Sequence, residues 1–130
     1  MSLIITNAGK VQAVSYLIGK DTTVQNLKLK LFSNNVTPTA STVSSDLVEV
    51  TGGGYASVNL TGSSWIISET TASYPQQTWN FTAAVGNVYG YYVTTADDST
   101  VIFAERFSDG PYVVAASGDI IRVTLSITMA

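Results

Sequence analysis

The segment Asn87–Phe107, NVYGYYVTTADDSTVIFAERF, decides the fold. It reads as two strands, Val88–Thr94 and Val101–Phe107, joined through a polar turn at residues 96–99. Both strands are rich in aromatic and β-branched residues, which pack well on a pleated, half-buried surface. Near its start, the second strand has apolar residues on both faces. We therefore expect a hairpin that is covered on both sides, deep in a sheet.

The second strand of this hairpin is expected to supply much of the core. Side chains alternate between the two faces of a strand, which puts Val101, Phe103, Glu105 and Phe107 on one face. An aromatic side chain buries about 150–250 Å². On this basis, replacing Phe103 with alanine is expected to cost roughly 3–5 kcal/mol of stability.

The composition sets limits on function. The chain has 130 residues, 12% of them charged, a net charge of -3, and neither cysteine nor histidine. This length suits one domain. Without clustered Lys and Arg, we expect no nucleic-acid binding. No apolar run is long enough to span a bilayer and no secretory signal is evident, so we expect no membrane association.

One short helix is predicted at residues 7–18. Thr6 or Asn7 can cap its start and Gly19 suits its end. A helix this short is marginal alone in water, so its apolar side is expected to lie against the sheets. Ahead of the helix, an apolar lead forms either an edge strand or an arm that docks on a neighbouring subunit: Leu3, Ile4 and Ile5.

The rest of the chain reads as short strands separated by turns. In the strand at residues 25–32, leucines alternate with Lys28 and Lys30, which are expected on a wet face as a guard against edge-to-edge aggregation. Residues 69–73 read as a loop. The clearest alternation is at residues 120–129. Further strands are predicted at 46–50, 55–60, 65–68, 76–82 and 112–115.

This pattern predicts an all-β fold, an antiparallel β-sandwich or a barrel, with one short N-terminal helix. We expect a single domain over residues 1–130, in which residues 1–20 form an N-terminal arm and the short helix.

Candidate chemistry is sparse. The usual nucleophile and base pairings need histidine or cysteine, so we expect no enzyme, no cofactor and no metal site. Asp97 and Asp98 read as a solvated turn. Glu105 shares a face with phenylalanines and, if buried, would need a partner such as Arg122. The glycine run at residues 52–54 is followed by a strand and not by the helix that a phosphate site requires.

The aromatic residues allow two interpretations. Exposed Tyr and Trp can line a sugar-binding site, whereas buried ones serve core or subunit-interface packing. The residues that we single out for a sugar site or an interface are Tyr55, Trp65, Tyr74 and Tyr92.

Several segments, in this order, resemble small virion structural proteins of tailed bacteriophages. They are LKLKLFSNNVTPTAST (27–42), GGGYASVNLTGSSW (52–65), YPQQTWNFTA (74–83), YGYYVTT (89–95), FAERF (103–107) and GDIIRVTLSIT (118–128). The resemblance covers nearly all of the chain from Leu27 onward, and none of its motifs is a catalytic signature.

The resemblance implies a capsid decoration or cement protein, a class that is often a trimeric jelly-roll sandwich clamping neighbouring capsomers. It implies the major capsid protein and further copies of the chain as partners, and a place on the virion capsid surface after assembly in the host cytoplasm. The alternative is a tail or fibre component with a receptor- or carbohydrate-binding role.

Overall fold

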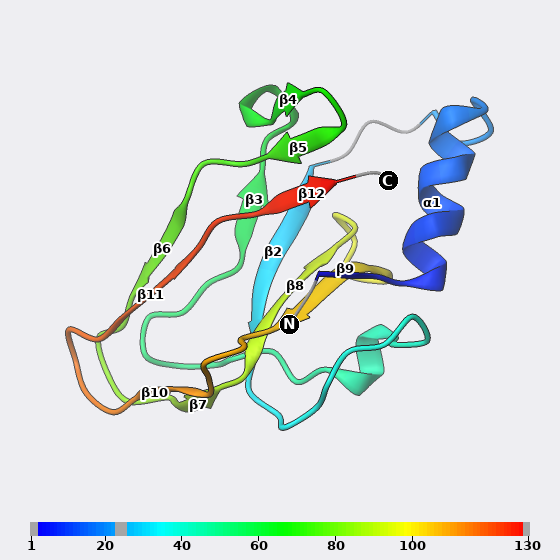
Figure 1. The fold of residues 1–130 in the computed structure, drawn as a ribbon. Helices are drawn as coiled ribbons and strands as arrows, with labels where there is room; N and C mark the ends of the chain where they lie inside the picture. Colours follow the sequence, from blue (N-terminus) through cyan, green and yellow to red (C-terminus); the bar gives the residue numbers. More distant parts are fainter. Residues whose placement is uncertain (1–2, 23–25, 129–130) are drawn as a thin grey trace.

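The computed structural model describes residues 3–22 and 26–128 and confirms an all-β fold of antiparallel sheets with one short helix (Figure 1). The elements are β1 (Ile4–Ile5), α1 (Asn7–Leu17), β2 (Leu27–Phe32), β3 (Val58–Leu60), β4 (Ile66–Ser68), β5 (Thr71–Ser73), β6 (Gln77–Asn80), β7 (Gly86–Val88), β8 (Gly90–Thr94), β9 (Val101–Arg106), β10 (Tyr112–Val114), β11 (Ile120–Val123) and β12 (Ser126–Thr128). Short 3-10 turns occupy Ser44–Asp46 and Gly62–Ser64.

The largest sheet has five strands in the order β1-β9-β8-β2-β3, all antiparallel. The expected hairpin is present as β8 and β9, next to the centre of this sheet. Smaller pairings join β10 with β7, β11 with β6, and β12 with β5 and β4. The strand expected at residues 120–129 is divided into β11 and β12, with Met129 outside the described residues. The loop expected at residues 69–73 is wrong in part, because Thr71–Ser73 pairs with β4 and β12.

The main core lies between the five-stranded sheet and the β6–β11 pair, which crosses one face of it (Figure 1). Trp79 and Phe81 are both buried, as their shared face predicts. The alternation at the C-terminal end is confirmed, since Ile121, Val123 and Leu125 are each at most 4% exposed.

A second apolar cluster covers the opposite face of the hairpin, as expected for a strand buried on both sides. Phe32 is fully buried there, among Leu47, Tyr92, Val101 and Ala104. Val101 was expected beside Phe103, and this is wrong. The register between β8 and β9 shifts after the pair Val93–Phe103, so Val101 pairs with the next residue of β8 and turns to the other face. A bulge of this kind opposes two residues to one.

The two lysines of β2 do not guard an edge, because β2 is flanked by β8 and β3. Lys30 is 6% exposed instead of solvated. The pattern gives the alternation correctly, but the loop at residues 46–50 and the hairpin tip cover the face that carries the lysines. Phe32 bridges to Glu49, and Lys30 bonds to Asp98 at the tip.

The helix α1 begins and ends near the predicted positions. Thr6 is the N-cap, and its side chain accepts a hydrogen bond from the Gly9 amide at 2.9 Å while donating one to the Val101 carbonyl at 2.5 Å. The chain turns away at Gly19, where φ is +74°, a conformation that glycine adopts without strain.

The expectation that the apolar side of α1 lies against the sheets is wrong. Gly9 is the buried residue of the helix, while Val11, Val14, Leu17 and Ile18 are 55–85% exposed. The backbone of α1 approaches β9 so closely at Gly9 that a Cβ atom there would lie 2.5 Å from the Ile102 carbonyl oxygen. The helix is therefore held by its first turns, and its large apolar side chains face outward.

Replacing Gly9 with valine is expected to release α1 from β9, because the obstructing atom belongs to the backbone and cannot rotate away. Amide hydrogen exchange over residues 10–17 should accelerate strongly while the β8–β9 amides stay protected. The matched control is Ala8→Val, which places the same side chain at an exposed position in the same turn. Unchanged exchange in Gly9→Val would contradict this mode of docking.

Candidate interaction surface

The exposed stripe of α1 is the first part of the candidate surface. Val11, Val14 and Ile18 follow the i, i+3, i+7 spacing that aligns side chains on one side of a helix, and Leu17 lies beside them at 85% exposure. Single exposed apolar residues are ordinary on protein surfaces, whereas a contiguous group of large ones marks an interaction site. We call these four residues the α1 stripe.

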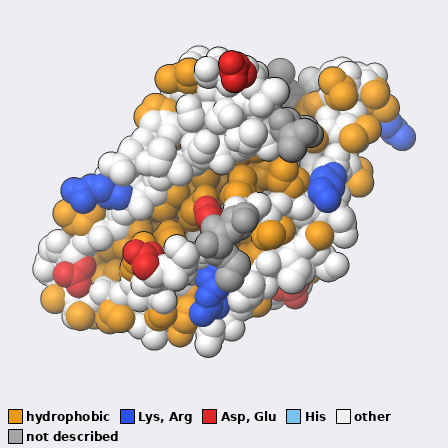
Figure 2. Space-filling model, in the orientation of Figure 1, with side chains coloured by type: hydrophobic (Ala, Val, Ile, Leu, Met, Phe, Trp, Pro, Cys, Tyr) orange, Lys and Arg blue, Asp and Glu red, His pale blue; other side chains and the backbone are white. Residues whose placement is uncertain are grey.

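Next to the stripe, two hollows adjoin each other. The first, about 360 Å³, lies between α1, β1, β9 and β12, and the second, about 270 Å³, lies along the β4–β5 hairpin. Figure 2 shows hydrophobic side chains gathered between α1, at the right, and the body of the molecule. Ile127 lines both hollows, which joins them into one face. The other lining residues that matter below are Phe103, Val14 and Lys10 in the first hollow, and Ile67, Ala72 and Glu69 in the second.

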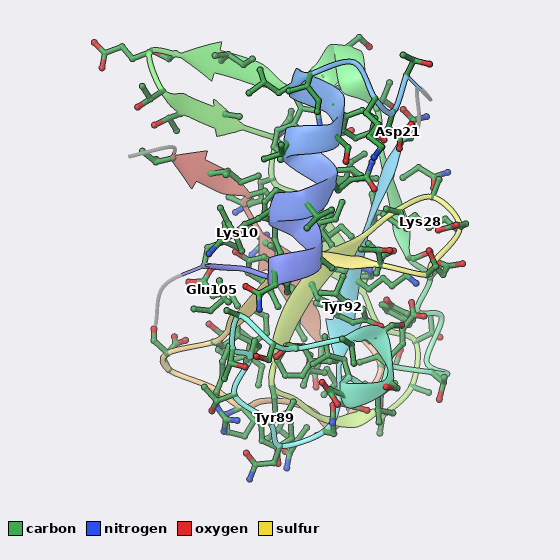
Figure 3. The ribbon with its side chains drawn as sticks, turned by 90° about the vertical axis from the view of Figure 1, so that its right-hand side faces the viewer. Lys10, Asp21, Lys28, Tyr89, Tyr92 and Glu105 are labelled. Carbon is green, nitrogen blue, oxygen red and sulfur yellow. The ribbon has the colours of Figure 1, made fainter. Side chains whose placement is uncertain are left out.

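The charges on this face are separated. Lys10 is exposed and lines the first hollow, and Glu69 is exposed and lines the second. Figure 3 shows Lys10 projecting from α1 on the side on which β12 lies. The face thus has a cation in one half, an anion in the other and Ile127 between them.

The aromatic residues singled out from the sequence do not come together at the surface. Tyr74 and Tyr92 are 7% and 4% exposed and belong to the core. Tyr55 stacks on Trp79 at 6.4 Å between ring centroids, and the ring of Trp65 meets Tyr74 edge-on at 5.1 Å. Leu3, Ile4 and Ile5 are half-buried at the edge of the five-stranded sheet, where Ile4–Ile5 pairs with β9.

The most buried charge belongs to Lys30. Its Nζ lies 2.5 Å from Asp98 Oδ1 and 3.9 Å from Glu49 Oε1, and 5.9 Å from the centroid of the Tyr92 ring. Glu49 in turn accepts a hydrogen bond of 2.7 Å from the Tyr55 hydroxyl. The network joins β2, the hairpin tip and the loop at residues 46–50.

The network also shifts the pKa values of its members. The hydrogen bond from Lys30 is the largest cause that lowers the pKa of Asp98, with Lys28 adding to it. Burial raises the pKa of Tyr55 and Tyr92 far above the ordinary tyrosine value, so both hydroxyls stay neutral. These shifts are those of a structural ion-pair network.

The other acids have structural partners. Asp97 accepts hydrogen bonds from Thr95 and Ser99 within its own turn, and these lower its pKa to about 2. Glu105 accepts from the Tyr91 hydroxyl and not from Arg122, which is exposed. Burial, and then this hydrogen bond, raise the pKa of Tyr91.

Within residues 3–22 and 26–128, no group of three or more acidic, histidine or cysteine side chains is placed to hold a metal ion. In the same described part of the chain, no helix is both long and apolar enough to cross a membrane. A polar hollow of about 410 Å³ adjoins the hairpin tip, but the Asp97 carboxylate in its lining is already bonded within the turn.

In the comparisons with known proteins, no family model, no curated protein sequence and no solved structure matches this chain. The function therefore has to be argued from the chain's own residues. The sequence predicted an apolar side on this helix but placed it against the sheets, and it did not predict the joined hollows, which depend on how β12 lies beside α1.

Proposed function

We propose that this chain is a structural protein of a tailed-phage virion, most specifically a decoration or cement protein that binds and stabilises the major capsid shell. The likeness of the segments between Leu27 and Thr128 to small virion proteins is one support. The observation that carries the proposal is the α1 stripe, a projecting group of four large apolar side chains that the described residues leave exposed.

The rest of the molecule is compatible with a protein that binds other proteins and does not catalyse a reaction. Stable protein interfaces bury about 1,200–2,000 Å² and contain an apolar centre. The α1 stripe can supply such a centre on a helix anchored by its first turns. The carboxylates of Asp97, Asp98 and Glu105 are all engaged in local contacts. We include in the proposal that the chain is no enzyme, binds neither nucleic acid nor membrane, and forms a homo-oligomer, with the trimer favoured.

We further propose a β-sandwich of jelly-roll type as the architecture. It is supported by the main core, in which Leu29 and Leu31 of β2 contribute from the five-stranded sheet and Trp79 and Ile121 from the β6–β11 pair. The alternative role as a sugar-binding tail or fibre component receives less support, because the aromatic residues on which it depended are engaged in packing.

The location can be tested on virions that carry the protein. Antibody labelling viewed by electron microscopy should show many copies distributed over the head. Labelling confined to the tail or its fibres would overturn the capsid assignment.

The role of the α1 stripe can be tested by rebinding purified protein to heads from which it has been stripped. Leu17→Glu is expected to weaken binding at least about 10-fold, because a charge would be forced into an apolar contact. The matched control is Val113→Glu on β10, which places the same charge at another exposed apolar residue, one that is 62% exposed. Equal binding by both variants would exclude the stripe as the attachment surface.

A further inference from the structure

We infer that the face formed by the two joined hollows is where one copy of this chain binds another, with Lys10 of each copy against Glu69 of the next. The inference deepens the proposed function, since it rests on the proposed homo-oligomer, but it is independent of attachment to a capsid.

The first step is that the face is built for a contact. Its floor consists of apolar side chains from β1, α1, the β4–β5 hairpin, β9 and β12, with Phe103, Ile127 and Ile67 among them. Ile67 is 76% exposed, which is unusual for an isoleucine in a strand. Hollows of this character, adjoining an uncovered helix, are typical of protein–protein interfaces.

The second step identifies the occupant by charge. Opposite charges across an interface fix the register of the partners and exclude wrong ones. A partner that satisfies this face needs an anion opposite Lys10 and a cation opposite Glu69, with an apolar surface between. A second copy of the same face, rotated by a half-turn, places its Glu69 opposite Lys10 and its Lys10 opposite Glu69. A second copy of the chain is therefore complementary to the face.

The third step is the symmetry. A two-fold axis that passes beside Ile127 brings the α1 half of each copy onto the β4–β5 half of the other, as an isologous contact requires. The same operation brings the Ile127 side chains of the copies together at the axis. Because the chain has a net charge of only -3, repulsion between copies is weak.

Charge reversal tests the pairing of Lys10 with Glu69. In sedimentation experiments on the full chain, Lys10→Glu and Glu69→Lys are each expected to weaken self-association about 10-fold or more, because each creates a like-charge contact. The double variant should recover most of the loss. Both residues are exposed, so the variants are expected to fold. Recovery supports the inference; a double variant as weak as the singles, or a wild-type monomer at every concentration, overturns it.

A crosslink tests the position of the axis. The chain contains no cysteine, so Ile127→Cys introduces a single thiol. Disulfides need Cα atoms about 4.4–6.8 Å apart, a distance that only a residue beside the axis meets with its own copy. Oxidation should therefore give a covalent dimer with Ile127→Cys and not with the control Val113→Cys, on β10. Crosslinking of both or of neither overturns the inference. Neither outcome alters the antibody labelling of heads, so the two proposals fail separately.

Discussion

Replacing Phe32 with alanine is expected to lower the free energy of unfolding by about 3–5 kcal/mol, the range for removal of a fully buried phenylalanine. Phe32 is 0% exposed, and its ring packs against Tyr92 at 6.3 Å between centroids. It also lies over Gly90, where a Cβ atom would come within 2.6 Å of the ring. Because Gly90 offers no side chain to fill the space, the cavity left by Phe32 has little means of closing.

The matched control is Phe103→Ala, the substitution for which the sequence predicts the same cost. Phe103 is half-buried, packs at the margin of the main core and lines the first hollow. Its replacement should therefore cost less than that of Phe32. Urea denaturation of both variants, monitored by tryptophan fluorescence, gives the comparison. Equal losses would mean that Phe103 is covered in solution, as it would be within an oligomer that uses the hollow.

The difference between these two phenylalanines shows what periodicity can predict. Alternation identified the faces of β11 correctly, because Ile121 and Val123 face one continuous core. It failed on β9, since the bulge between Val101 and Phe103 moves Val101 to the opposite face. A register shift is a property of two strands together, and one strand's sequence does not contain it.

The helix and the lysines illustrate the second limit. Cap and stop residues predicted α1 almost to the residue, because capping depends on local hydrogen bonds. The direction in which its apolar stripe points depends on the close approach at Gly9, which is a tertiary contact. Lys30 was read as solvated for the same reason, since the residues that bury it, Glu49 and Asp98, are distant in the chain.

The burial of Lys30 leads to an asymmetric prediction for its ion pair. Asp98→Ala is expected to cost about 2–3 kcal/mol, because it leaves a buried ammonium without its main partner. This is less than for a fully buried pair, since Glu49 remains 3.9 Å away and the Asp98 side chain is 51% exposed. Lys30→Met should cost less than Asp98→Ala, because the carboxylate that it leaves behind can turn to water while the methionine fills the same space.

The pH dependence of the same variants separates charge from packing. Lys30 holds the pKa of Asp98 below its value in the unfolded chain, about 3.9. The pair therefore contributes its full stability above that pH and loses it as the pH falls through the lower, folded-state pKa. Thermal unfolding of the wild type and Asp98→Ala should accordingly converge in acid and diverge toward neutral pH. Asp97, which also has a lowered pKa, is present in both proteins and cancels in the difference. A gap that stayed constant across this range would assign the loss to packing at the hairpin tip and not to the charge of Asp98.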